Sequence, residues 1–144
     1  MTYIRSERKT AFAEPFLLLG GFLSVCSFLV VDDSAFSRKV VGNYLKKFFP
    51  GASVDYAPDG ETGLQKYVEL KPDCVFVDLL MPKIGGLDLI RYLKAKGCER
   101  IVVLSADIQK SVRADAEALG VTSFLNKPLN DEKMRELAAK LRDA

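Results

Sequence analysis

Short apolar runs alternate with amphipathic segments along most of the chain. Five runs of five or six residues are rich in Val, Phe and Ile and are bounded by polar residues. They are SFLVV, SVDYA, DCVFVD, RIVVLS and TSFLN, at residues 27–31, 53–57, 73–78, 100–105 and 122–126. Runs of this length and composition are typical of strands buried in a parallel sheet.

The segments between these runs have the period of amphipathic helices. Their apolar faces are Val40, Val41, Tyr44, Leu45 and Phe48; Leu64, Tyr67 and Val68; Leu87, Ile90 and Leu93; Val112, Ala116 and Leu119; and Met134, Leu137, Ala138 and Leu141. Gly97 and Gly120 end the third and fourth helices, and Asn130 or Asp131 is expected to cap the fifth. Gly63 inside the second helix costs about 1 kcal/mol relative to alanine. Five strands alternating with five helices predict an α/β fold with helices on both faces of a parallel sheet.

Residues 1–25 differ from the rest of the chain. A polar start precedes an apolar run from Phe16 to Val31, which is shorter than the roughly 20 residues that span a bilayer. A charged start before a short apolar run also resembles a signal peptide, although Val25 stands where a lipoprotein cleavage site has a small residue. We expect a flexible extension in residues 1–25, with weak membrane contact as the alternative, and one domain in residues 26–144.

Composition narrows the function classes. The net charge of +2 gives no reason to expect nucleic acid as a partner, and no membrane partner is expected for the domain. The chain contains no histidine, so no histidine of its own acts as nucleophile, base or metal ligand. The three cysteines form no CxxC pair, and an odd number argues against a disulfide framework. We expect a reducing, cytoplasmic setting.

Chemically active side chains follow the carboxyl ends of four expected strands. They are Asp32 and Asp33 after the first, Asp78 at the end of the third, Ser105 at the end of the fourth and Lys127 after the fifth. Each alone is most often a turn, cap or solvated residue. In an open α/β sheet, however, ligands bind outside the carboxyl ends of the strands. Three neighbouring carboxylates repel one another, and Mg²⁺, which prefers oxygen ligands, relieves that repulsion.

A carboxylate beside Mg²⁺ can also attack a phosphoryl group and form an acyl phosphate. The metal ion and Lys127 would neutralise charge on the transferring oxygens, and the hydroxyl of Ser105 could bond the product. Asp78 is the best candidate for the nucleophile, because it stands alone at its strand end and is followed by the turn-forming segment LLMPKIGG.

Four motifs, LVVDDS, VFVDLLMPKIGGLDLI, VVLSA and FLNKPL, occur in this order. Together they resemble the receiver domain of two-component response regulators, over roughly residues 27–143. The resemblance implies a flavodoxin-like, doubly wound (βα)5 sheet with strand order 2-1-3-4-5. It also implies a stand-alone switch, as in chemotaxis or a phosphorelay. Such a switch accepts a phosphoryl group from a histidine kinase or phosphotransfer protein. Its only catalysis is its own phosphorylation and dephosphorylation, and it signals to a downstream target protein.

The resemblance assigns roles to the residues at the strand ends. Asp78 is the phosphate acceptor. Asp33 and Asp78 ligate Mg²⁺ through their side chains, Leu80 does so through its backbone carbonyl, and Asp32 holds the ion through water. Lys127 contacts the phosphoryl group.

The resemblance also implies a switch and an output surface. Ser105 is the switch hydroxyl and Phe124 the switch aromatic, and the peptide bond before Pro128 is expected to be cis. The output surface is expected on the fourth helix, fifth strand and fifth helix. Leu80 is apolar and Asp107 is acidic at two positions that tune phosphate loss in the family.

Three other interpretations fit less well. A flavin-binding flavodoxin needs a Ser/Thr/Gly-rich phosphate loop after the first strand, and DDSAFS is acidic there. An aspartyl phosphatase needs Asp-x-Asp, and the second position is Leu80. A receiver fold kept only as a scaffold is disfavoured by the set of Asp33, Asp78 and Lys127.

Overall fold

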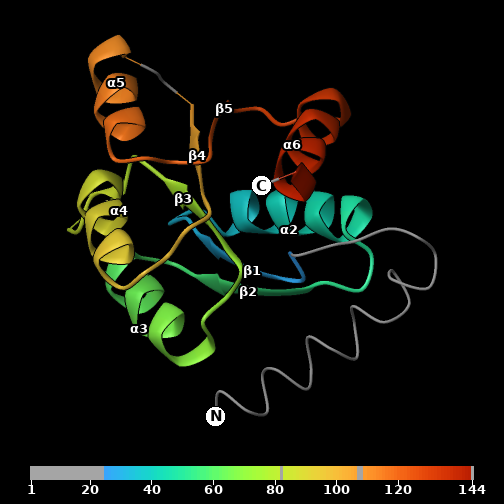
Figure 1. Cartoon of the computed structure of the whole chain (residues 1–144), viewed down its shortest axis with the longest axis horizontal. Coiled ribbons are helices and arrows are strands. Elements are labelled where there is room, and N and C mark those ends of the chain that lie inside the picture. Colours follow the sequence, from blue (N-terminus) through green and yellow to red (C-terminus); the bar gives the residue numbers. More distant parts are fainter. Residues whose placement is uncertain (1–24, 82, 107–108, 144) are drawn as a thin grey trace.

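The computed structural model describes residues 25–143 apart from 82 and 107–108. In this part of the chain, five strands alternate with five helices (Figure 1). They are β1 (Ser27–Val31), α2 (Ala35–Phe48), β2 (Ser53–Ala57), α3 (Gly60–Leu70), β3 (Cys74–Asp78), α4 (Gly86–Ala95), β4 (Ile101–Ser105), α5 (Lys110–Ala118), β5 (Ser123–Asn126) and α6 (Asp131–Asp143).

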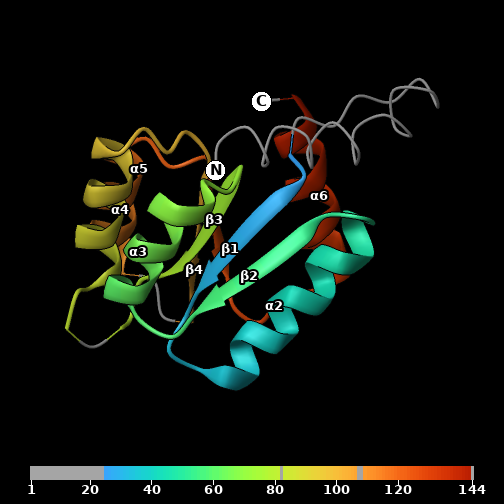
Figure 2. The ribbon, with the colours of Figure 1, turned by 90° about the horizontal axis from the view of Figure 1, so that it is seen from below.

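The five strands form one parallel sheet in the order β2-β1-β3-β4-β5, which confirms the predicted topology. Helices α2 and α6 cover one face, and α3, α4 and α5 cover the other (Figures 1 and 2). The strand β1 lies between β2 and β3, so the residues that follow β1 and those that end β3 meet at the same edge of the sheet.

Alternate residues of the central strands supply the two halves of the core. Phe28 and Phe76 face α2 and α6, whereas Leu29 and Val77 face α3, α4 and α5. Every residue of β1, β3 and β4 is buried. The prediction of buried strands is therefore right for these three. The strands β2 and β5 are mostly half-buried, because an edge strand has a neighbour on one side alone.

The predicted apolar face of α3 is partly wrong. Tyr67 is buried, but Val68 is 48% exposed. The helix instead turns Gly63 toward β1, where an added Cβ would lie 2.8 Å from a methyl carbon of Val31. Glycine at this position therefore allows a close approach of helix and strand, which explains a residue that is otherwise unfavourable in a helix.

Polar side chains cap the helices α2 and α6 at their amino ends. The hydroxyl of Ser34 accepts a hydrogen bond from the N–H of Ser37 at the start of α2. Asn130 accepts one from the N–H of Lys133 over 2.8 Å, so Asn130 rather than Asp131 caps α6. Among the described residues, no helix is both long and apolar enough to cross a membrane.

Candidate functional site

Three carboxylates meet at the carboxyl edge of the sheet, as the sequence predicts. One oxygen of each of Asp32, Asp33 and Asp78 lies within 4.8 Å of the others. Asp32 is fully buried and Asp78 is 6% exposed, whereas Asp33 is exposed. This donor set of hard oxygen atoms, with one member open to solvent, fits Mg²⁺, which binds one or two carboxylates and keeps several waters.

The Asp32 carboxylate accepts three hydrogen bonds. The N–H of Ser34 donates to Oδ1 over 2.9 Å, and the hydroxyl of Ser37 donates to Oδ2 over 2.5 Å. The ammonium of Lys127 donates to the same Oδ2 over 2.9 Å. Burial alone would raise the pKa of Asp32, but the bonds from Ser37, Lys127 and Ser34 outweigh burial and hold the pKa below its ordinary value of 3.8. Asp32 is therefore a carboxylate that the fold keeps ionised.

Asp78 has a less favourable environment. Its Oδ1 accepts a hydrogen bond from the N–H of Leu80 over 3.1 Å, and its Oδ2 lies 3.4 Å from the ammonium of Lys127. Burial raises the pKa of Asp78, and the charge of Asp32 adds to this, so the pKa lies above 3.8 despite the bonds from Leu80 and Lys127. The two carboxylates compete for one ammonium, and Asp32 is the closer to it. Of these two carboxylates, Asp78 therefore gains more from a further cation.

Lys127 is placed by the end of β5. Its N–H donates to the carbonyl of Ser105 over 2.8 Å, and the following peptide bond to Pro128 is cis, as predicted. The side chain is 22% exposed. Burial lowers the pKa of Lys127, but its bonds to Asp32 and Asp78 outweigh burial and raise it, so the ammonium stays charged.

The two residues predicted to form a switch lie on neighbouring strands. Ser105 is buried at the end of β4. Phe124 is half-buried on β5, opposite Val103, and the guanidinium carbon of Arg113 on α5 lies 5.3 Å from the centre of its ring. The side chain of Leu80 is 60% exposed beside the carboxylates. Asp107 lies outside the described residues.

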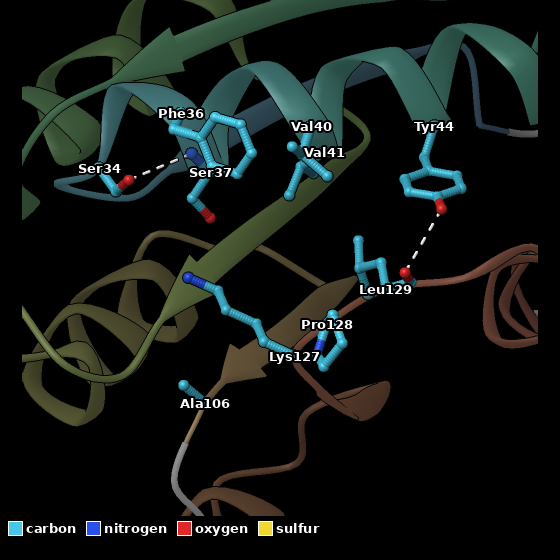
Figure 3. Close-up of a pocket in the computed structure, with 10 residues that line it drawn as sticks. All are labelled: Ser34, Phe36, Ser37, Val40, Val41, Tyr44, Ala106, Lys127, Pro128 and Leu129. Atoms are coloured by element: carbon cyan, nitrogen blue, oxygen red, sulfur yellow. Dashed lines mark hydrogen bonds between the residues drawn. The ribbon is translucent and has the colours of Figure 1, made fainter.

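An apolar groove of about 520 Å³ opens next to these residues, between α2 and the segment that follows β5 (Figure 3). Val40, Tyr44 and Leu129 line it, and the hydroxyl of Tyr44 donates to the carbonyl of Leu129 over 3.3 Å. Ser37 and Lys127 also line it, at the end away from Tyr44 (Figure 3). Neither the groove nor the contact of Ser37 with Asp32 was predicted from the sequence. The one signal in the sequence for the Ser37 contact is a hydroxyl in the first turn of a helix that follows Asp32 and Asp33.

Known proteins share this chain's sequence and fold. Residues 28–139 match the family described as response regulator receiver domain. Chemotaxis protein CheY of Thermotoga maritima is 34% identical over 115 residues, which cover 78% of this chain and 94% of that protein. Protein-glutamate methylesterase/protein-glutamine glutaminase 1 of Myxococcus xanthus is 41% identical over 104 residues, which cover 72% of this chain and 30% of that protein.

A solved structure gives the same result. The response regulator domain of Thermotoga maritima CheB aligns with a TM-score of 0.68 and 30% identity, over 83% of this chain and 92% of that domain. The chain spans about 30% of the length of the methylesterase from Myxococcus xanthus, so the match to that protein concerns one part of it. The matched residues, the strand order and the carboxylate cluster all agree, and the chain belongs to the response regulator receiver domain family of two-component signalling.

Proposed function

We propose that this protein is a phosphorylation-controlled signalling switch in which Asp78 accepts a phosphoryl group from a histidine kinase or phosphotransfer protein. The observation that carries the proposal is the shared lysine: Lys127 lies 2.9 Å from Asp32 and 3.4 Å from Asp78. A buried nucleophile, an ammonium that can follow the transferred charge and an acidic cluster that fits a divalent cation are the parts that phosphoryl transfer to a carboxylate requires.

In the proposed reaction, an oxygen of Asp78 attacks the phosphorus atom as the bond from phosphorus to the donor nitrogen breaks. The new bond is that of an acyl phosphate, and the donor imidazole leaves with the electron pair of the broken bond. Lys127 moves from the carboxylates toward the phosphoryl oxygens and neutralises part of their charge. Asp32, Asp33, Asp78 and the carbonyl of Leu80 would hold Mg²⁺, which when bound supplies charge neutralisation at the same oxygens.

The surroundings of the site suit a protein as donor. The groove reaches Lys127, and Phe36 beside it is 78% exposed, so apolar surface is available next to the acceptor. The helix α2 contains no acidic residue, and its basic side chains are Arg38, Lys39, Lys46 and Lys47. A partner with an apolar ridge and an acidic flank would complement this helix while its phosphoryl group reaches Asp78.

We propose that Ser105 and Phe124 carry the signal to α5, β5 and α6. A phosphoryl group on Asp78 offers oxygens that the hydroxyl of Ser105 can reach by moving toward the site. This movement leaves space that Phe124 can enter, at the cost of its present contact with Arg113. The surface that changes would bind the downstream target protein. Its charged residues include Lys110, Arg113, Asp115 and Arg135, all exposed, and Lys133, whose ammonium donates to the carbonyls of Asn126 and Pro128.

Ser105→Ala tests this route. With Mg²⁺ and beryllofluoride, an acyl-phosphate mimic, the wild-type protein should show amide chemical-shift changes at the acceptor site and across α5 and β5. The Ser105→Ala variant should keep the changes near Asp78 but lose most of those on α5 and β5, because the hydroxyl that follows the phosphoryl group is missing. Equal changes in α5 and β5 for both proteins would show that the signal takes another route.

We propose that residues 26–144 form the receiver domain and residues 1–25 an extension. Residues 1–24 lie outside the described part of the chain, whereas Val25, the last residue of this extension, packs in the core with α2 and α6. We also propose a cytoplasmic location and, among two-component pathways, chemotaxis, because CheY of Thermotoga maritima is a relative that the chain covers almost completely.

A further inference from the structure

The hydroxyl of Ser37 makes a contact that helix formation does not require. Ser34 caps α2 by accepting from the N–H of Ser37 over 3.2 Å. The side chain of Ser37 is therefore not needed for the cap, and its hydroxyl donates instead to Oδ2 of Asp32 over 2.5 Å. Figure 3 shows this hydroxyl directed from α2 toward the ammonium of Lys127.

The three hydrogen-bond donors to Asp32 differ in which oxygen they bind and in whether they also contact Asp78. Lys127 is shared with Asp78 and would move toward a phosphoryl group in the proposed reaction. The N–H of Ser34 binds the other oxygen, Oδ1. If Lys127 moves away from Asp32, Ser37 is the remaining donor to Oδ2 of Asp32 among the contacts described for this carboxylate. Because Asp32 is fully buried, an oxygen that lost both donors would carry uncompensated charge.

A contact of the neighbouring residue also ties the start of α2 to the end of β1. The guanidinium of Arg38, the next residue, donates to the backbone carbonyl of Asp32 over 2.7 Å, so the first turn of α2 is tied to the end of β1 twice. The start of α2 therefore orients the Asp32 carboxylate through the N–H of Ser34 and the hydroxyl of Ser37, in addition to the ammonium of Lys127.

We infer that Ser37 is a positioning residue for cation binding: its hydroxyl fixes the Asp32 carboxylate beside Asp33 and Asp78 and thereby sets the affinity of the cluster for Mg²⁺. The inference rests on the proposed function, since it concerns the same metal site. Groups that orient metal ligands in this way typically change metal affinity 10- to 100-fold when they are removed. We therefore expect Ser37→Ala to weaken Mg²⁺ binding by about tenfold.

The test is an Mg²⁺ titration followed by amide chemical shifts, on the full chain without phosphoryl donor. Ser37→Ala removes the hydroxyl, and Ser37→Cys replaces it with a thiol of similar shape that is a weak donor. Ser37→Thr keeps the hydroxyl, and its added methyl group has room because Ser37 borders the groove. Ser53→Ala, at the amino end of β2 and hence at the opposite edge of the sheet, is the matched control.

Weaker binding in Ser37→Ala and Ser37→Cys, with affinity close to that of the wild type in Ser37→Thr and Ser53→Ala, is the expected result. The role of Ser37 is refuted if either the alanine or the cysteine variant folds and binds Mg²⁺ as tightly as the wild type, or if threonine fails to restore the affinity. A wild-type protein that does not bind Mg²⁺ would instead contradict the metal site of the proposed function, so the two failures are distinguishable.

Discussion

Replacing Asp78 with asparagine is expected to stabilise the metal-free protein at neutral pH, by roughly 1 kcal/mol, although it removes the proposed phosphate acceptor. The Asp78 carboxylate is buried, its pKa is raised, and the nearest ammonium lies closer to Asp32. Folding therefore disfavours the charged form of this side chain, and a neutral amide of the same shape avoids that cost.

The pH dependence of this effect has a definite sign. Because the pKa of Asp78 is raised by folding, the protonated group favours the folded state below the unfolded pKa of about 3.8, and this contribution is lost as the pH rises through the folded pKa. The advantage of Asp78→Asn should therefore be small at pH 3 to 4 and largest at neutral pH. Urea unfolding of both proteins at several pH values, in the presence of a chelator, measures it.

Asp73→Asn is the matched control at the opposite edge of the sheet. Its Oδ2 accepts hydrogen bonds from the N–H groups of Cys26 and Ser27 and from the hydroxyl of Ser27, over 3.0 to 3.1 Å. The same substitution should therefore destabilise the protein there. If Asp78→Asn proves as destabilising as Asp73→Asn at neutral pH, the charged form of Asp78 stabilises the fold, and folding does not disfavour it.

Lys127→Met is expected to have the largest destabilising effect of the substitutions considered. Methionine keeps much of the apolar stem but removes the charge that Asp32 and Asp78 share. Breaking a buried ion pair by removing one partner commonly costs about 3 kcal/mol, because the other charge stays buried. The cost should fall as the pH drops below about 3.8, because Asp32, whose pKa is lowered by folding, then contributes less stability in the wild type.

Lys47→Met provides the comparison. Lys47 forms an ion pair with Asp131 over 2.8 Å, but the two side chains are 59% and 45% exposed. A pair in such solvent contact is worth at most about 1 kcal/mol. Thermal or urea unfolding of the metal-free variants should separate the two lysines clearly, and Mg²⁺ should restore part of the stability lost in Lys127→Met. Equal losses for both variants would show that Lys127 is not the counter-charge of the buried carboxylates.

The parallel sheet and the carboxylate cluster were predictable from the sequence. The sheet follows from short apolar runs, and the cluster follows from the rule that parallel strands end at one edge of the sheet. The residues just before Asp32 and Asp78 form apolar runs, Phe28–Val31 and Cys74–Val77, which is typical of central parallel strands, and parallel strands bring their carboxyl ends to one edge. Family resemblance supplied the strand order. The match of residues 28–139 to the receiver family confirms that resemblance.

The details that were not predictable depend on the rotation and approach of whole elements. Ser37 reaches Asp32 because α2 turns its first residues back toward β1, and no periodicity in the sequence encodes that angle. Val68 is exposed because α3 turns Gly63 and Tyr67 toward the core and Val68, one residue further along the helix, away from it. The ammonium of Lys127 lies closer to Asp32 than to Asp78 by less than an ångström. Side-chain packing sets this difference, and sequence pattern does not encode it.

Asp78 is proposed as the phosphate acceptor, and intact-mass spectrometry tests this claim most directly. The wild-type protein, Asp78→Asn and Asp33→Asn would each be incubated with acetyl phosphate, with Mg²⁺ or with a chelator. The wild type should gain the mass of a single phosphoryl group in the presence of Mg²⁺ and much less with the chelator, Asp33→Asn should gain little, and Asp78→Asn should gain none. A phosphorylated Asp78→Asn protein, or a folded wild type that stays unmodified with Mg²⁺, would contradict the claim.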